Sequence, residues 1–235
     1  MNIFWGDEYD NFSFVPFSYS HWIMIIIFIV ALFILYYKQP FFRKHDTVVR
    51  IILFLLLFCL EGMYHIWLYK DGYWDLSFTL PLQLCSISLI LCLILLLSKS
   101  RMIFQLVYFI GVIGATMAII TPELFEGFPH FRFFQFFITH ILIVFICLYF
   151  VFVHQYKPTW KGLLFSFLFL NVCAGVAFLM NNLLGGNYMF LAYKPTNGSL
   201  LDYFGPYPYY ILTLEMAAIV MFSLLLLPFL FKNQK

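Results

Sequence analysis

The sequence predicts an all-α integral membrane protein, built as one bundle of seven transmembrane helices. Hydrophobic residues make up 64% of the 235 residues and charged residues only 10%, whereas soluble proteins carry about 25% charged residues. A bilayer core requires about 20 predominantly apolar residues per helix. Seven stretches meet that requirement, at residues 21–37, 48–69, 79–98, 102–121, 133–153, 162–183 and 209–231. We therefore expect residues 1–235 to form a single membrane domain.

The first stretch is predicted to be a permanent span. Asp7, Glu8 and Asp10 precede it, whereas a cleavable signal peptide would carry basic residues there. Short loops that hold most of the basic residues separate the middle stretches. The last stretch follows a loop at residues 184–208 that is rich in Gly, Asn, Pro and Tyr. That composition predicts a structured re-entrant or lid segment before the seventh helix.

The loop charges predict an orientation with the N-terminus outside and the C-terminus inside. Lys and Arg are retained in cytoplasmic loops, and most of them fall on the side that follows the first, third, fifth and seventh stretches. That side holds Lys38, Arg43, Lys44, Arg50, Lys99, Arg101, Lys157, Lys161, Lys232 and Lys235, whereas the other holds Lys70, Arg132 and Lys194. The net charge of only +2 gives no reason to expect nucleic acid as a partner.

Polar side chains within the apolar stretches fall at one depth. Such residues are costly in a bilayer and usually point into the bundle. A rise of 1.5 Å per residue places most of them roughly 6–12 Å below the outer surface. They are Glu61 and His65 in the second stretch, Gln83 and Cys85 in the third, Thr139 and His140 in the fifth, Asn181 and Asn182 in the sixth, and Glu215 in the seventh. The pattern predicts a pocket in the outer half of the bundle, whereas the inner half offers little comparable.

A structural or solvated role is expected for several further side chains. His45, His130 and His154 fall in loops and are expected to be solvated, and Asn171 is deep enough to make a helix–helix hydrogen bond. None of the five cysteines forms a CxxC pair or a Cys/His spacing typical of zinc, so we expect no metal and no cofactor.

Short motifs along most of the chain resemble a known family. They are LPLQLCS at 80–86, GVIGA at 111–115, ITP at 120–122, FFITH at 136–140, NLLGGNYM at 182–189 and GPYP at 205–208. Together they resemble the bacterial YwaF-like integral membrane proteins, relatives of transmembrane protein 164. The resemblance implies a multi-pass, seven-helix protein of the bacterial cell membrane whose partners are membrane lipids.

The resemblance also implies a chemistry. The eukaryotic relatives are described as phospholipid acyltransferases, with a cysteine in the third helix and a histidine in the fifth. His140 matches that histidine. The relatives open the third helix with Pro-Cys-His, where this chain has Pro81-Leu82-Gln83, and the nearest thiol here is Cys85.

A lipid acyltransferase or acyl hydrolase is therefore the leading functional hypothesis. Cys85 would be the nucleophile and His140 the base, with Glu61 or Glu215 orienting the imidazole. The groups expected to bind substrate, some of them as oxyanion donors, are Gln83, His65, Thr139, Asn181, Asn182, Asn187 and Tyr188.

Other classes of protein remain as alternatives. A non-enzymatic lipid-binding protein or a transporter would also gather Glu, His and Asn inside a bundle, although no inverted repeat is evident. A metal site from His65, His140 and either Glu61 or Glu215 has suitable ligand types but lacks the usual spacing. A retinal protein is excluded because the seventh stretch has no lysine between Tyr209 and Phe231.

Overall fold

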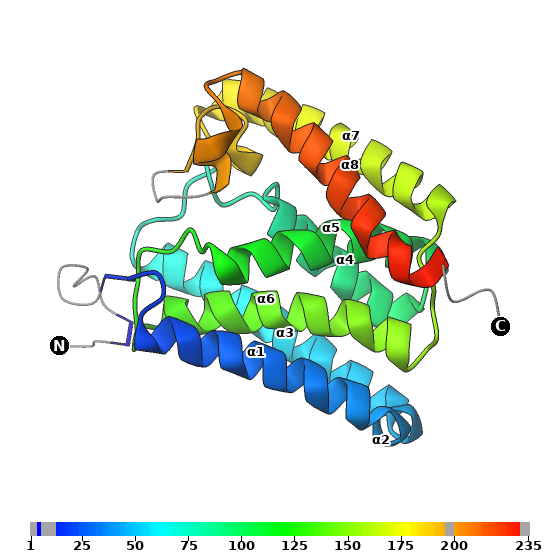
Figure 1. Cartoon of the computed structure of the whole chain (residues 1–235). Helices are drawn as coiled ribbons and strands as arrows, with labels where there is room; N and C mark the ends of the chain where they lie inside the picture. Colours follow the sequence, from blue (N-terminus) through cyan, green and yellow to red (C-terminus); the bar gives the residue numbers. More distant parts are fainter. Residues whose placement is uncertain (1–3, 6–12, 196–199, 231–235) are drawn as a thin grey trace.

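The computed structural model describes residues 4–5, 13–195 and 200–230, and nearly all of its regular structure is helical (Figure 1). The helices are α1 (Tyr19–Tyr37), α2 (Gln39–Lys44), α3 (Asp46–Lys70), α4 (Leu84–Ser98), α5 (Arg101–Ile120), α6 (Phe131–Phe152), α7 (Trp160–Leu184), η2 (Tyr188–Phe190), η3 (Leu200–Phe204) and α8 (Tyr209–Leu230). The predicted all-α membrane class is confirmed.

Six of these helices, α1, α3, α5, α6, α7 and α8, are long and apolar enough to cross a membrane within the described residues. The seventh predicted span differs from its prediction. A helix was expected over 79–98, but α4 starts at Leu84 and has 15 residues, which is about 22 Å against a bilayer core of about 30 Å. The seven-span count and the orientation of the termini therefore stay predictions.

Two causes keep residues 79–83 out of the helix. Pro81 disfavours helical backbone at the residue before it. In addition, the N–H of Leu80 donates to the Tyr188 hydroxyl at 2.9 Å, and Oε1 of Gln83 accepts from the N–H of Met189 at 2.9 Å. The segment is thus bonded to the loop after α7 and forms turns in place of a helix.

Side-chain caps explain where several helices begin. The Ser18, Ser100 and Thr159 hydroxyls accept from backbone N–H groups in the first turns of α1, α5 and α7. Nδ1 of His130 does the same for α6, accepting from the N–H of Arg132 at 3.1 Å. The expectation that His130 is solvated is wrong, because its side chain is only 6% exposed.

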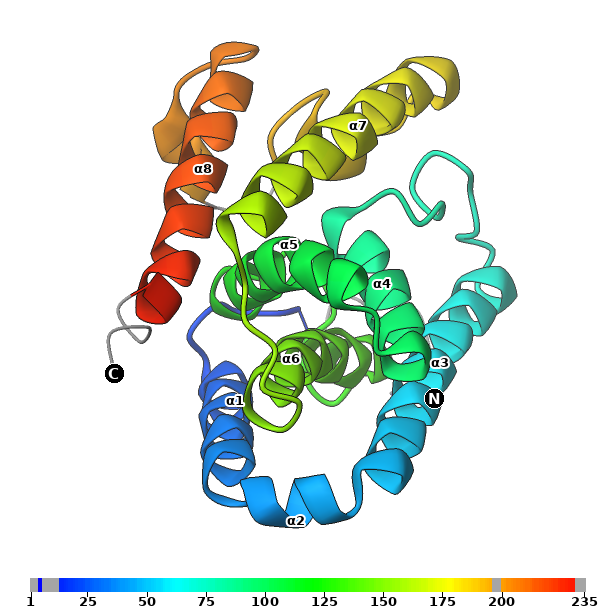
Figure 2. The same cartoon turned by 90° about the vertical axis from the view of Figure 1, so that its right-hand side faces the viewer.

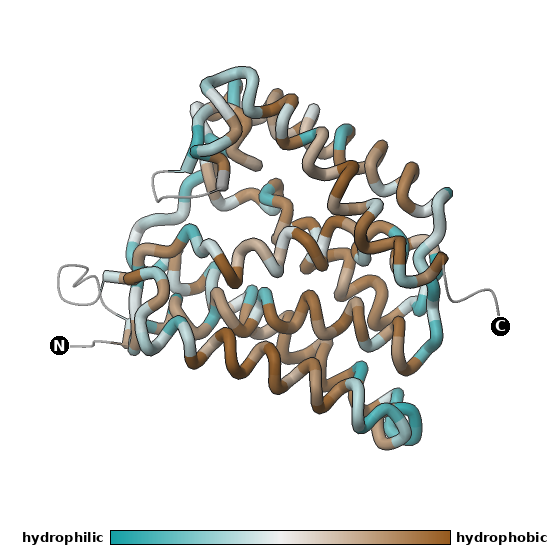
Figure 3. Tube along the Cα trace, viewed as in Figure 1, coloured by the Kyte–Doolittle hydropathy of each residue, from teal (hydrophilic) through white to brown (hydrophobic). Residues whose placement is uncertain are grey.

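Helix α6 is the centre of the bundle. In Figure 2 it lies among α1, α3, α4 and α5, and it packs against all four. In the most apolar 18-residue stretch of each helix, 72% of the residues are buried in α6, compared with 17% in α1, α7 and α8. Large aromatic residues such as Phe133, Phe137, Tyr149 and Phe150 account for this burial. The outer helices are rich in apolar residues (Figure 3), and many of these residues are exposed, as lipid contact requires.

Two glycines of α5 allow α4 to approach closely. A Cβ on Gly111 would lie 3.1 Å from Cγ2 of Ile143 and 3.5 Å from Cβ of Ser88. A Cβ on Gly114 would lie 3.1 Å from Cδ2 of Leu84. Small residues at such contacts let helix backbones pack tightly in membranes. The GVIGA motif therefore sets the position of the first turn of α4, where Cys85 lies.

Candidate functional site

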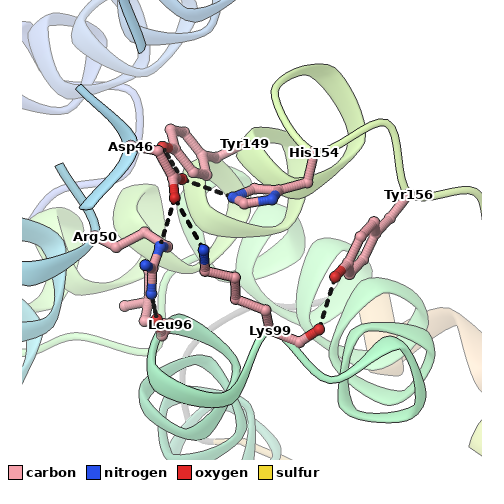
Figure 4. A network of polar contacts seen from close by, with 7 residues as sticks. All are labelled: Asp46, Arg50, Leu96, Lys99, Tyr149, His154 and Tyr156. Atoms are coloured by element: carbon pink, nitrogen blue, oxygen red, sulfur yellow. Dashed lines mark hydrogen bonds and ion pairs between the residues drawn. The ribbon is translucent and has the colours of Figure 1, made fainter. Parts of the chain in front are cut away.

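A group of side chains around one carboxylate joins α3, α4 and α6 (Figure 4), and we call it the Asp46 clamp. Oδ1 of Asp46 accepts hydrogen bonds from the Tyr149 hydroxyl at 2.8 Å and from Nε2 of His154 at 2.7 Å. Oδ2 accepts from Nε of Arg50 at 3.1 Å and from Nζ of Lys99 at 3.2 Å. Two cations, an imidazole and a phenol from three parts of the chain thus share one carboxylate.

Two further bonds extend the clamp. Arg50 also donates to the backbone oxygen of Leu96, and the Tyr156 hydroxyl donates to the backbone oxygen of Lys99 at 2.7 Å (Figure 4). The end of α4 is therefore fixed both to α3 and to the segment after α6. We call this end of the molecule, formed by residues 38–50, 98–101 and 153–161, the basic end.

The clamp corrects two expectations. The inner half of the bundle was expected to offer little comparable to the polar groups of the outer half, and His154 was expected to be solvated. Instead, the His154 ring stacks on Phe150 with centroids 4.6 Å apart and donates to Asp46. Burial lowers the pKa of His154 below its usual range, although the Asp46 carboxylate acts in the opposite direction. A lone acidic residue among the basic loops was the sequence signal for this network.

The clamp provides a common reference for depth along the three helices it joins. Counted from the clamped ends at 1.5 Å per residue, Glu61 lies about 22 Å along α3, Cys85 about 20 Å along α4 and His140 about 18 Å along α6. These helices pack against one another in pairs. The structure therefore brings three of the four predicted catalytic residues to one level on neighbouring helices.

Arg132, in the first turn of α6, is the positive centre of this region. Its guanidinium lies 4.3 Å from the centroid of the Tyr64 ring and 5.4 Å from that of Phe136. It also donates a hydrogen bond to Oε1 of Gln135, whose Nε2 donates to the Thr139 hydroxyl at 3.5 Å. Two aromatic faces and one amide therefore hold the guanidinium in place.

The contact with Tyr64 places Arg132 against α3, three residues from Glu61, and Arg132 lies about two turns before His140 on α6. From its position in the sequence, Arg132 was expected only as a charge of an external loop. Its signal was its position, because a cation in the first turn of a helix opposes the helix dipole and needs another source of stabilisation. The two aromatic rings and the Gln135 amide supply it here.

The hydrogen bonding of His140 fixes its tautomer. Nδ1 lies 2.6 Å from the backbone oxygen of Phe136, which can only accept, so Nδ1 carries the proton. Nε2 of the neutral ring then has a free lone pair and no hydrogen-bond partner among the described residues. The side chain is 7% exposed. This is the form in which an imidazole acts as a base.

Glu61 and His65 form the pair that their spacing predicts. Oε1 of Glu61 lies 3.6 Å from Nε2 of His65, one turn further along α3. Both side chains are partly exposed. No hydrogen bond joins Cys85 to His140 in the part of the chain that the structure describes, so their relation rests on depth and helix packing.

The structure gives internal partners to most of the residues expected to bind substrate. The side chain of Asn181 bonds both backbone groups of Tyr188, accepting from its N–H at 2.6 Å and donating to its oxygen at 3.0 Å. The Tyr188 hydroxyl donates to the backbone oxygen of Leu76 at 2.7 Å. Oδ1 of Asn187 accepts from the N–H of Ala192 at 3.0 Å. With the Gln83 bond described above, these contacts pin the loop after α7 to residues 75–83.

Close packing at Gly186 belongs to the same contact, and we expect Gly186→Ala to destabilise the protein by about 2 kcal/mol. A Cβ there would lie 2.2 Å from the backbone oxygen of Ser77, so the loop must move. Gly175→Ala on α7 is the matched control, because a Cβ there meets nothing within 4 Å. Thermal unfolding in detergent should show a loss for the first variant only; equal midpoints would contradict the contact.

Two predicted site residues lie elsewhere. Oε2 of Glu215 accepts from Nδ2 of Asn171 at 3.1 Å, which joins α8 to α7. Nδ2 of Asn182 donates to the backbone oxygen of Phe178 at 2.8 Å on the exposed side of α7. Figures 1 and 2 show α7 and α8 together at one edge of the bundle, across α5 from α3. Glu215 is therefore not brought to Cys85 and His140.

The metal alternative finds no support in the geometry. Within the described residues, no three His, Cys, Asp or Glu side chains are placed to hold a metal ion. The five cysteines are all free thiols. The site thus consists of a thiol, an imidazole, an acid–imidazole pair and one guanidinium.

A comparison with protein families now places the chain. The model of the TMEM164 family matches residues 16–226. The chain belongs to this family. The match extends from before α1 to residue 226 in the last turns of α8 of this TMEM164-family protein, and it includes Glu61, Cys85, Arg132 and His140. No curated protein and no solved structure matches the chain.

Proposed function

We propose that this TMEM164-family protein is a membrane-embedded lipid acyltransferase or acyl hydrolase of a bacterial cell membrane, acting on phospholipid through Cys85 and His140. One observation carries the proposal. Cys85, His140 and Glu61 lie at one level on three helices that pack against one another, and the Arg132 guanidinium lies at the same end of this group, against Tyr64 of α3. A neighbouring cation stabilises both a thiolate and a developing oxyanion.

The proposed reaction proceeds in two halves. Nε2 of His140 takes the proton from Sγ of Cys85, and the thiolate attacks the ester carbonyl carbon of a phospholipid. The ester C–O bond breaks, the departing lysophospholipid oxygen takes the proton from His140, and the acyl group stays on sulfur as a thioester. A lipid hydroxyl or water then gives its proton to His140 and attacks the thioester. The C–S bond breaks and Sγ regains the proton.

Glu61 is proposed as a positioning residue for the reaction, whereas Glu215 is not. Glu61→Gln removes the carboxylate that lies against His65, and we expect acyl transfer to fall about tenfold or more with little change in unfolding temperature. Glu215→Gln keeps the hydrogen bond with Asn171 and should leave activity unchanged. Steady-state rates and thermal unfolding of both variants check this; equal losses of activity would contradict the assignment.

The proposal is tested with purified protein and phospholipid labelled in one acyl chain. The expected result is a lysophospholipid product together with labelled protein whose label is released by neutral hydroxylamine, as a thioester requires. Mass spectrometry should place the label on Cys85. A label on oxygen or on another cysteine would overturn the thiol mechanism.

A lipid-binding or transporter-like function is the second candidate. The observation in its favour is α4, a 15-residue helix preceded by a non-helical segment, because transporters build substrate sites from interrupted helices. Phospholipid that stays bound to the protein without turnover, with no labelled protein, would favour this function. Product formation would exclude it as the sole activity.

A further inference from the structure

A groove lies at the basic end, where α1 meets α2. It has a volume of about 610 Å³ and is lined by Tyr36, Gln39, Pro40, Arg43 and Lys44. In Figures 1 and 2, α2 forms the corner of the molecule that joins α1 to α3. None of the residues of α2 is buried. Phe42 packs against Phe145 and Tyr149, whereas Arg43 and Lys44 are exposed and available to a ligand.

The charge of the groove is not compensated by the protein. Asp46 is the one acidic residue in the sequence segments 38–50, 98–101, 153–161 and 231–235. Both of its oxygens are already engaged in the clamp. Arg43 and Lys44 are exposed and form no ion pair or hydrogen bond within the described residues. An anion that balances them must therefore come from outside the chain.

The surroundings place the groove at the level of lipid headgroups. Tyr36, Tyr37 and Phe41 are 54%, 70% and 55% exposed beside it, and exposed aromatic residues gather at the membrane–water interface. Figure 3 shows the apolar colouring of α1 giving way to hydrophilic colouring at α2. A ligand in the groove thus meets cations on one side and the lipid-facing surface of α1 on the other.

We propose that this groove binds the phosphate of an anionic phospholipid, with the acyl chains lying along α1. The Arg43 guanidinium and the Lys44 ammonium bind the phosphate oxygens. A phospholipid is favoured because the groove opens beside the apolar face of α1. An anionic lipid is favoured over a zwitterionic one because the groove carries two positive charges and no acid. This binding site is independent of the proposed acyl chemistry.

The test measures binding of phosphatidylglycerol to the full chain by native mass spectrometry, with phosphatidylcholine as the zwitterionic comparison. Arg43→Gln and Lys44→Gln should each weaken phosphatidylglycerol binding about fivefold. Lys161→Gln is the matched control, because it removes an exposed charge from the same end, outside the groove. This control should change phosphatidylglycerol binding less than about twofold. Phosphatidylcholine binding should be the same in all three variants.

Circular dichroism of the variants should match the wild type, since α2 has no buried residue. Losses of the same size in Lys161→Gln and Arg43→Gln would show a diffuse attraction to the whole basic end and would overturn the groove. Equal affinity of the wild type for phosphatidylcholine and phosphatidylglycerol would overturn it as well. Neither result depends on turnover, so the outcome is separate from that of the acyl assay.

Discussion

Cys85→Ser should reduce acyl transfer or hydrolysis at least about a thousandfold. A serine hydroxyl is a far weaker nucleophile than a thiolate and is much harder for an imidazole to deprotonate than a thiol. The volume hardly changes, so folding should be retained. Release of a labelled acyl chain from phospholipid by purified protein measures the loss.

His140→Ala should produce a defect of the same size, and the double variant should be no worse than either single one, because residues that act as a unit are not additive. Cys173→Ser on α7 is the matched control, a partly buried thiol outside the α3–α4–α6 group, and should retain full activity. Full activity in Cys85→Ser would exclude the thiol mechanism.

Asp46→Asn should lower the free energy of unfolding by about 3 kcal/mol. The amide keeps one acceptor, but it places an N–H₂ donor against Arg50 and Lys99 and removes the charge that holds these two cations together. The Asp46 side chain is only 20% exposed, so water replaces the lost interaction incompletely. An SDS titration of the protein in mild detergent would measure the change.

Asp75→Asn is the control for this variant. The Asp75 side chain is exposed and accepts from the N–H of Ser77 at 2.7 Å, a bond that asparagine can also accept. Its unfolding midpoint should stay that of the wild type. An equal midpoint for Asp46→Asn would mean that the clamp contributes nothing to stability.

The amino-acid sequence alone determined the class of the protein and most of its helices. Length, apolar content and the positions of the polar breaks located six spans to within about two residues at most of their ends. The Glu61–His65 pair was also predictable, because residues four apart on a helix face the same side whatever the rest of the chain does. These features depend on local sequence and on the bilayer, which acts as a uniform solvent.

Features that combine distant segments were decided by the tertiary structure. The partners of Asp46 at Tyr149 and His154 are 103 and 108 residues away, and no periodicity links them. The late start of α4 depends on the Gln83 bond to a backbone 106 residues later. A pattern of 3.6 residues per turn predicts a longer helix there and cannot detect such a bond.

The candidate site shows the same division. Depth counting placed Glu61, Cys85 and His140 at one level, because helix rise is nearly constant. It placed Glu215 at that level too, but depth along a helix does not say which helices are neighbours, and α8 packs against α5 and α7. The position of Arg132 likewise follows from the packing of α6 against α3 and α4. Sequence fixes how far along its helix a side chain lies, whereas only the packing of the helices decides which side chains meet.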